Sequence, residues 1–172
     1  MIEFDFAATA SRPALKVFWY DGGKKPDAAK LAGKWSDGKE TKEFSEFKSS
    51  GSLIIGEKAK IFSPDDYGAE YFWQGDMDTK EVEFDRSPGH FKEWVNSIKG
   101  GKPAWSNFQN YAGKLTEVIL LGNLAVWAAG QSKDGKQVES PKLEWDQANL
   151  KVKGTTAYDS MITPTYRTGY EC

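Results

Sequence analysis

The sequence predicts an α+β fold: a mixed, mainly antiparallel β-sheet with helices on one face and an open second face. Hydrophobic and polar residues alternate in short segments of the first half, which is the pattern of half-buried strands. In the second half, hydrophobic residues recur at helical spacing. The chain also carries seven Trp, seven Tyr and ten Phe. Some of these aromatic residues are expected on the open face, which favours an interface there over contact with water.

Two strands and a tight turn are predicted at the start of the chain. Apolar residues alternate with acidic ones over 2–6, and a second alternating segment, 15–20, carries aromatic residues on both faces. Asp21-Gly22-Gly23 then predicts a turn, because glycine adopts positive φ without steric cost.

The rest of the first half is predicted as one polar loop followed by short strands. Residues 24–50 are rich in Lys, Asp, Glu and Ser, so an exposed loop with one short helix near 27–31 is expected. A hairpin turns at Gly56-Glu57. The strands expected in this region are 52–55, 58–62, 70–73 and 80–84.

Helices are predicted next. Ser87 is the expected N-cap and Pro88 the first helical residue, and apolar side chains recur at helical spacing until Gly100-Gly101 ends the helix. A longer helix is expected over 111–129. Asn123 disfavours a helix interior, so a specific hydrogen-bond partner that holds the helix to the sheet is expected for it.

The last third is predicted to contain a surface insertion and short elements. The insertion is 131–141, and Trp145 in the following segment is interpreted as a core residue. The elements expected here are a strand at 143–145, an extended segment at 148–152, and a short helix with a tail over 157–170.

Composition limits the function. A chain of 172 residues suits one domain, 1–172, with a sizeable core. The net charge is −2 with interspersed signs, so nucleic acid is not an expected partner. The apolar runs, such as 118–121, are too short to span a bilayer, so no membrane partner is expected. With one His and one Cys, no zinc or iron site is expected and an intrachain disulfide is excluded.

No convergent catalytic set is visible. The glycines never fall as G-x-G-x-x-G between a strand and a helix, and no phosphate-binding G-x-x-x-x-G-K-[ST] is present. A serine triad would require His90, and nothing resembles a nucleophile elbow. No catalytic, cofactor-binding or metal-binding residue is therefore assigned to this chain.

Five residues are candidates for substrate contact. His90 could move a hydroxyl proton, or it could simply lie in the first helical turn, which is the favoured interpretation. Tyr20 and Asp21 could bind a sugar, although a tight turn is favoured. Tyr67 follows two aspartates that could hold a cation or polyol, or could face water. Arg86 could bind an acidic group but is more often a capping or surface residue.

The order of motifs is more specific than any single motif. The second half contains RSPGHFKEW (86–94), SNFQNYAGKLTEVILLGNLA (106–125), KLEWDQANLKV (142–152) and TYRTGYE (165–171). The first half contains LKVFWYDGGKKP (15–26) and GSLIIGEKAKIFSPDDYG (51–68). This order resembles the C-terminal domain of the Gfo/Idh/MocA family, the glucose–fructose oxidoreductase and inositol dehydrogenase family. The segment QSKDGKQVESP (131–141) is longer than that family pattern implies.

The resemblance implies a function shared with a part that this chain lacks. In the family, a nicotinamide-binding Rossmann domain with the catalytic Lys precedes this region, and the catalytic His lies on a helix just after that domain, also before this region. NAD or NADP is therefore expected for the full-length protein and no cofactor for this chain. The implied roles are shaping the pocket for a small sugar or polyol and forming a homo-oligomer through the open sheet face. Neither the substrate nor the compartment, bacterial cytoplasmic or exported, follows from these residues.

The alternative is a free-standing carbohydrate-binding or protein-interaction module, which the many aromatic residues favour. Such a module is expected to expose a row of aromatic rings beside polar side chains, whereas the oxidoreductase domain is expected to bury one sheet face in a self-contact.

Overall fold

The computed structural model describes residues 1–48, 50–78, 83–130 and 141–170. The chain divides into two compact units, the first formed by Met1 with Glu3–Asp85 and the second by Ile2 with Arg86–Cys172. The α+β class is confirmed, since strands and helices are both present and every described strand register is antiparallel. The described strands form three sheets rather than one.

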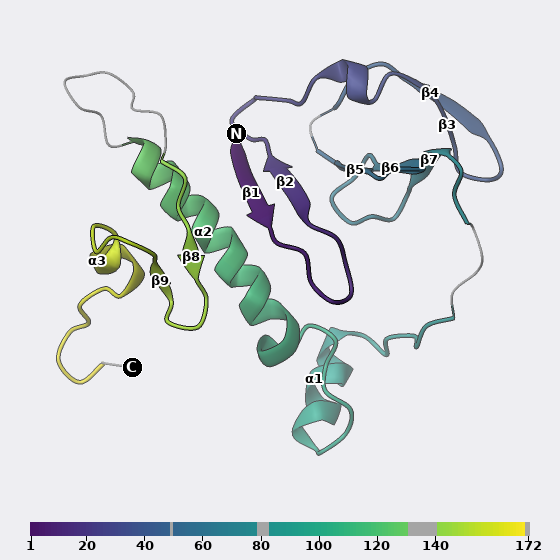
Figure 1. The fold of residues 1–172 in the computed structure, drawn as a ribbon. Coiled ribbons are helices and arrows are strands. Elements are labelled where there is room, and N and C mark those ends of the chain that lie inside the picture. Colours follow the sequence, from purple (N-terminus) through teal and green to yellow (C-terminus); the bar gives the residue numbers. More distant parts are fainter. Residues whose placement is uncertain (49, 79–82, 131–140, 171–172) are drawn as a thin grey trace. The chain divides into compact units, whose positions relative to one another are not determined.

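The first unit contains most of the strands. Strands β1 (Ile2–Phe6) and β2 (Leu15–Trp19) pair in a two-stranded sheet. A five-stranded sheet has the order β4-β3-β7-β6-β5 (Figure 1). Its strands are β3 (Gly33–Ser36), β4 (Thr41–Phe44), β5 (Ser52–Ile55), β6 (Ala59–Ser63) and β7 (Phe72–Gly75).

The loop predicted over 24–50 is wrong in part, because it contains β3 and β4. Each of these strands contributes only one aromatic residue to the core, Trp35 and Phe44. The surrounding Lys, Glu and Ser residues therefore hide the alternation from a composition-based prediction. The short helix expected near 27–31 is confirmed as the 3-10 turn η1 (Ala28–Lys30), where the Asp27 side chain accepts from the Ala29 N–H at 2.9 Å.

A small aromatic core lies on one face of the five-stranded sheet. Its buried residues are Leu31, Trp35, Phe62 and Phe72, and Phe44, Phe47 and Leu53 pack against them. The rings meet at an angle, as in the Phe44–Phe62 pair with centroids 5.0 Å apart, and such edge contacts suit the aromatic quadrupole. The Trp35 indole N–H donates to the Leu31 carbonyl at 2.7 Å, which satisfies its one polar atom in the core.

The predicted hairpin is confirmed, with β5 and β6 joined through the turn at Gly56-Glu57. Strand β7 begins two residues later than the predicted 70–73 segment. The strand predicted over 80–84 falls largely on residues 79–82, which lie outside the described residues.

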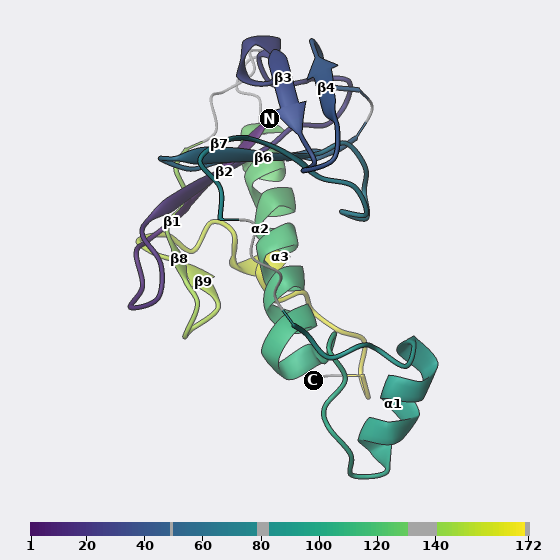
Figure 2. The ribbon, with the colours of Figure 1, turned by 90° about the vertical axis from the view of Figure 1, so that its right-hand side faces the viewer.

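The second unit contains the longer helices. Helix α1 (His90–Ile98) lies beyond the N-terminal end of α2 (Gly113–Gly130), and the π-helical turn η2 (Phe108–Ala112) leads directly into α2 (Figures 1 and 2). A two-stranded sheet of β8 (Trp145–Asp146) and β9 (Lys151–Val152) follows, and α3 (Asp159–Ile162) is the short helix expected near the end. Residues 131–140 of the predicted insertion lie outside the described residues.

The predicted start of α1 is corrected by two residues. Gly89, not Ser87, is the N-cap, and its φ of 101° suits glycine and few other residues. Ser87 still acts at this terminus, because its hydroxyl accepts from the Gly89 N–H at 3.0 Å and donates to the Glu93 carboxylate. The predicted end at Gly100-Gly101 is confirmed, with Gly100 at φ 83°.

Candidate functional site

The second face of the five-stranded sheet carries a row of apolar residues. Ile54 lies opposite Ile61, and Ile61 lies opposite Trp73 on the next strand. Because side chains alternate between faces along a strand, this row lies on the face opposite Leu53 and Phe62 of the core. We call Ile54, Ile61 and Trp73 the open-face row. It ends at the sheet edge, where Ile54 is 62% exposed.

Tyr71 extends the open-face row beyond the end of β7. Its ring stacks on Trp73 with centroids 6.1 Å apart and planes inclined by 29°. The turn glycine Gly38 also lies close to the indole, since a Cβ there would meet the Trp73 ring at 3.1 Å. Trp73 thus gives the face an aromatic centre that contacts a stacked ring and lies beside a turn.

Tyr20 and Asp21 lie at a tight turn, as the favoured interpretation predicted. Gly22 and Gly23 have φ of 59° and 82°, and the Asp21 carbonyl accepts from the Lys24 N–H at 3.1 Å. The Asp21 carboxylate accepts from the Trp19 indole N–H at 3.3 Å. These contacts account for Asp21 structurally, and a substrate role for this pair stays a prediction.

The loop that carries Tyr67 is organised by Asp65. The Asp65 carboxylate accepts from the backbone N–H groups of Tyr67 at 2.6 Å and Glu70 at 3.1 Å, and also from that of Ala69. These bonds, the one from Glu70 first, lower the pKa of Asp65. Asp66 accepts from the Ser50 hydroxyl. Both aspartates therefore have donors within the chain, while the Tyr67 side chain is 92% exposed.

His90 begins α1, in the first helical turn as the favoured interpretation predicted, and its side chain is exposed. Three residues later, Glu93 accepts from the Ser87 hydroxyl and from the Trp105 N–H at 3.1 Å. The Ser87 bond, then the Trp105 bond, lowers the pKa of Glu93. Glu93 thereby joins α1 to the segments before and after it. Arg86 is exposed in the extended segment that leads to this cluster.

The predicted substrate residues belong to different units. Tyr20, Asp21 and Tyr67 lie in the first unit, whereas Arg86 and His90 lie in the second. Substrate contact by each of them stays a prediction.

Glu117 on α2 is a structural residue that the sequence interpretation missed. Its carboxylate accepts from the Trp145 indole N–H at 2.6 Å and from the Gln147 side-chain amide at 3.1 Å. Trp145 is half-buried, which agrees with its interpretation as a packing residue. An indole and a carboxylate in separate predicted elements give no sequence signal that they meet.

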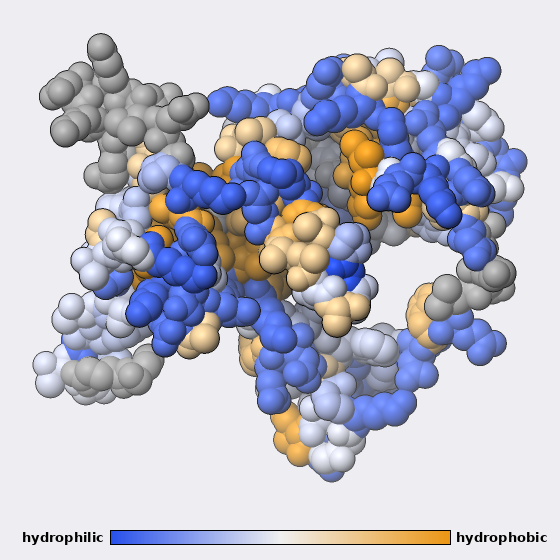
Figure 3. Space-filling model, viewed as in Figure 1, coloured by the Kyte–Doolittle hydropathy of each residue, from blue (hydrophilic) through white to orange (hydrophobic). Residues whose placement is uncertain are grey.

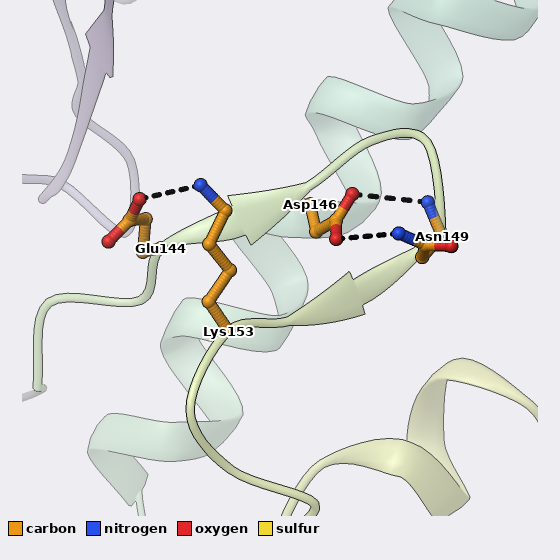
Figure 4. A network of polar contacts seen from close by, with 4 residues as sticks. All are labelled: Glu144, Asp146, Asn149 and Lys153. Atoms are coloured by element: carbon orange, nitrogen blue, oxygen red, sulfur yellow. Dashed lines mark hydrogen bonds and ion pairs between the residues drawn. The ribbon is translucent and has the colours of Figure 1, made fainter.

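The hairpin of β8 and β9 has its own polar contacts. Lys153 pairs with Glu144 at 2.7 Å across the hairpin, and Asp146 accepts from both the side-chain and backbone N–H groups of Asn149 in its turn (Figure 4). The Asn149 side-chain bond, followed by the backbone bond, lowers the pKa of Asp146. These contacts fix the hairpin shape, and Glu117 then fixes it to α2.

Helix α2 exposes much of its apolar surface. Only Gly122, Leu124 and Ala128 are buried on it, and hydrophobic residues reach the surface along part of the helix (Figure 3). The exposed large residues on this helix are Leu115, Ile119, Leu120, Val126 and Trp127. Asn123 is also exposed, and the hydrogen-bond partner expected for it stays a prediction.

No membrane partner was expected from the sequence, and the length and composition of one helix are relevant to this expectation. Among the described residues, one helical segment, Phe108–Gly130, is long and apolar enough to cross a bilayer by length and composition alone. The core helix of a soluble protein, which is mostly buried, passes the same test, and here 17% of the apolar window is buried.

Asn107 is the N-cap residue of η2, the turn that leads into this long helix. Its side chain accepts from the Asn110 N–H at 2.8 Å, which caps the N-terminus of η2, and donates to the Ala104 carbonyl at 3.0 Å, which ties η2 to the preceding turn.

No protein-family model, curated protein or solved structure matches this chain. The resemblance to the Gfo/Idh/MocA C-terminal domain therefore rests on the motifs of the chain itself. Within the described residues, no group of three or more His, Cys, Asp or Glu side chains is placed to hold a metal ion. The most distinctive candidate surface is the open-face row.

Proposed function

We propose that this chain is the substrate-side and self-association domain of an NAD(P)-dependent sugar or polyol oxidoreductase, and that it has no dehydrogenase activity by itself. The cofactor and the catalytic Lys belong to a Rossmann domain outside this chain, and the catalytic His belongs to a helix just after that domain. The oxidoreductase assignment rests on the resemblance in motif order, and the self-association role rests on the surface described above.

The open-face row is the observation that carries this proposal. The core face of the sheet is filled by Leu31 and by aromatic side chains, so the sheet needs no further cover on that side. The second face has Ile54, Ile61 and Trp73 in line across three adjacent strands. A row of this kind on an antiparallel sheet favours a sheet-to-sheet contact, since burial of apolar surface is the main driving force for association.

The substrate-side role would use groups around the start of α1. Arg86 directly precedes Ser87, and His90 lies within the segment that the Ser87–Glu93 contact closes, so this contact fixes the backbone around both residues. An exposed imidazole and a guanidinium on such a fixed segment suit contact with the hydroxyl or acidic groups of a polyol.

The alternative is a free-standing carbohydrate-binding module, which one observation favours. Trp19 is 56% exposed beside Asp21, and a ring next to a carboxylate is a common way to stack on and hydrogen-bond a sugar. Titration of the purified chain with inositol and glucose, followed by tryptophan fluorescence, separates the two: saturable binding that Trp19→Ala abolishes would favour the module.

Self-association is tested by sedimentation equilibrium of the chain with and without Ile61→Lys. A buried lysine in the row opposes apolar burial, so we expect the variant to associate at least tenfold more weakly, which corresponds to about 1.4 kcal/mol. Ala8→Lys, which adds the same charge at an exposed position outside the five-stranded sheet, is the control. Equal association of both variants would contradict the role of this face.

The oxidoreductase assignment is tested at the gene. The reading frame upstream of the codon for Ile2 is expected to encode a G-x-G-x-x-G turn between a strand and a helix, and a Glu-Lys-Pro segment. A stop codon directly before Met1 would overturn this assignment and would favour the alternative, a free-standing carbohydrate-binding module.

A further inference from the structure

We propose that β5 is a pairing edge, at which two copies of the chain join their five-stranded sheets through antiparallel β5–β5 contact. The inference rests on the self-association part of the proposed function but concerns the edge of the sheet and not its face. It is independent of the oxidoreductase assignment.

The two edges of the five-stranded sheet differ in charge. The strand order places β4 at one edge and β5 at the other (Figure 1). Strand β4 has the sequence TKEF, with adjacent charges at Lys42 and Glu43. Strand β5 has the sequence SLII and carries no charge. Charged residues are the usual protection of an edge strand against pairing, and β5 lacks this protection.

The exposed side chains of β5 are unusually apolar for an edge strand facing water. Ile54 is 62% exposed and Ile55 is 54% exposed, and they point to opposite faces of the sheet. A partner strand would therefore cover apolar surface on both faces at once.

The hydrogen-bonding pattern of the β5–β6 hairpin shows which backbone N–H and C=O groups of β5 point away from β6. The Gly56 N–H donates to the Ala59 carbonyl at 2.9 Å and closes the hairpin. Hydrogen-bonded and non-hydrogen-bonded pairs alternate along an antiparallel ladder, so Ile54 and Ser52 bond to β6. Leu53 and Ile55 then direct their N–H and C=O groups to the open edge.

A second copy of β5 matches these outward groups. Around a two-fold axis through Ile54, Leu53 of one copy faces Ile55 of the other, and both residues offer outward N–H and C=O groups. Ile54 then lies directly opposite Ile54 of the second copy. Such a pair joins the two open-face rows into one apolar row across both sheets.

Charge explains why the partner is β5 and not β4. The Asp37 N–H donates to the Glu40 carbonyl at 3.2 Å, so the same alternation directs Thr41 and Glu43 outward on β4. Pairing of β4 with itself in the equivalent register would place Lys42 against Lys42, and like charges directly opposite are destabilising. The β5 pair brings no charges together.

Cross-linking tests the register. In a Cys172→Ser background, Ile54→Cys should form a disulfide-linked dimer with oxidised glutathione, because directly opposed residues of a non-hydrogen-bonded pair have Cα atoms about 4.5 Å apart, within disulfide range. Lys42→Cys, the matched position on β4, reports random collision and should cross-link at least tenfold more slowly. Equal rates for the two variants would overturn the inference.

A proline variant tests the backbone contact. Ile55→Pro removes an outward N–H while leaving the bonds to β6, so it should raise the dissociation constant by about tenfold or more. Glu43→Pro removes the matched outward N–H on β4 and should leave association unchanged. Circular dichroism spectra of both variants check that each folds.

The outcomes separate this inference from the proposed function. If the Ile55→Pro variant still associates and the Ile54→Cys variant does not cross-link, the edge inference fails and the proposal of association through the open-face row stands. If Ile61→Lys has no effect but Ile55→Pro dissociates the dimer, the face proposal fails and the edge stands. A wild-type chain that is monomeric at every concentration overturns both.

Discussion

Asp65 illustrates how one carboxylate organises a loop. Its oxygens accept three backbone N–H groups from the residues that follow, and Tyr67 projects from the loop that results. The sequence favoured a water-facing turn at Asp65 and Asp66, with a cation or polyol site as the alternative. The hydrogen bonds favour the turn, because the carboxylate that would bind a ligand already has its donors.

The pKa shift of Asp65 predicts an acid dependence of stability. The folded-state pKa lies below the ordinary value, so this carboxylate stabilises the fold above about pH 4 and the contribution is lost as pH falls through the lowered pKa. Asp65→Asn should therefore melt at a lower temperature than wild type at pH 7, and the difference should shrink toward pH 2.

Thermal melts across that pH range provide the measurement. Glu57→Gln, which removes a carboxylate from the turn between β5 and β6, is the control. The difference in melting temperature between this variant and wild type should not change with pH. A constant difference between Asp65→Asn and wild type from pH 7 to pH 2 would show that the loop does not depend on the charged form.

Among the elements, the contact between the β8–β9 hairpin and α2 depends on one acidic side chain. Two-residue strands are too short to be stable alone, and Glu117 bonds both Trp145 and Gln147 of the hairpin. Sequence patterns predicted the helix and placed a short strand beside it, but they did not indicate the contact, which joins residues 28 positions apart.

Glu117→Ala should release this hairpin. The loss of two hydrogen bonds to a charged acceptor is expected to cost about 1–3 kcal/mol and to increase amide exchange in β8 and β9. Hydrogen exchange and urea unfolding followed by circular dichroism give the measurement. Glu144→Ala removes an ion pair whose side chains are largely exposed, and little change is expected. A larger effect from Glu144→Ala would reverse this ranking.

The elements also show which sequence signals are dependable. Long periodic segments and glycine turns predicted α2, the β5–β6 hairpin and the 21–23 turn correctly, since these depend on local chemistry. Strands β3 and β4 were missed because one aromatic residue per strand carries their burial. The start of α1 was misplaced because the N-cap residue is Gly89, and Ser87 only accepts a hydrogen bond from the Gly89 N–H.

At the scale of the molecule, the first unit depends on a small core. Trp35 is 1% exposed, and its indole contacts Phe62 and bonds to Leu31. A few aromatic residues thus support a five-stranded sheet, so each should contribute a large part of the free energy of unfolding.

Trp35→Ala should destabilise the first unit by about 3–5 kcal/mol, which is the usual cost of removing a large buried ring. Trp35→Phe should cost less, because it retains a ring beside Phe62 and loses only the bond to Leu31. Urea unfolding followed by circular dichroism provides the values. A cost below 1 kcal/mol for Trp35→Ala would contradict the assignment of this core.

The candidate site is only partly predictable from sequence for a related reason. The open sheet face was expected, but its residues follow from strand register, which places Ile54, Ile61 and Trp73 in line although they span nineteen positions of the chain. Register depends on turn closure at Gly56 and on core packing by Leu53, and neither is visible in composition.

Because only one of the two sheet edges carries charged residues, the number of chains that can join through their strand edges is limited. A sheet with two uncharged edges can add chains without limit and form a fibre. Here only β5 lacks charge, and pairing would use it up in both copies. The joined sheet would present two β4 strands at its outer edges, each with Lys42 and Glu43, so assembly through strand edges would stop at two chains.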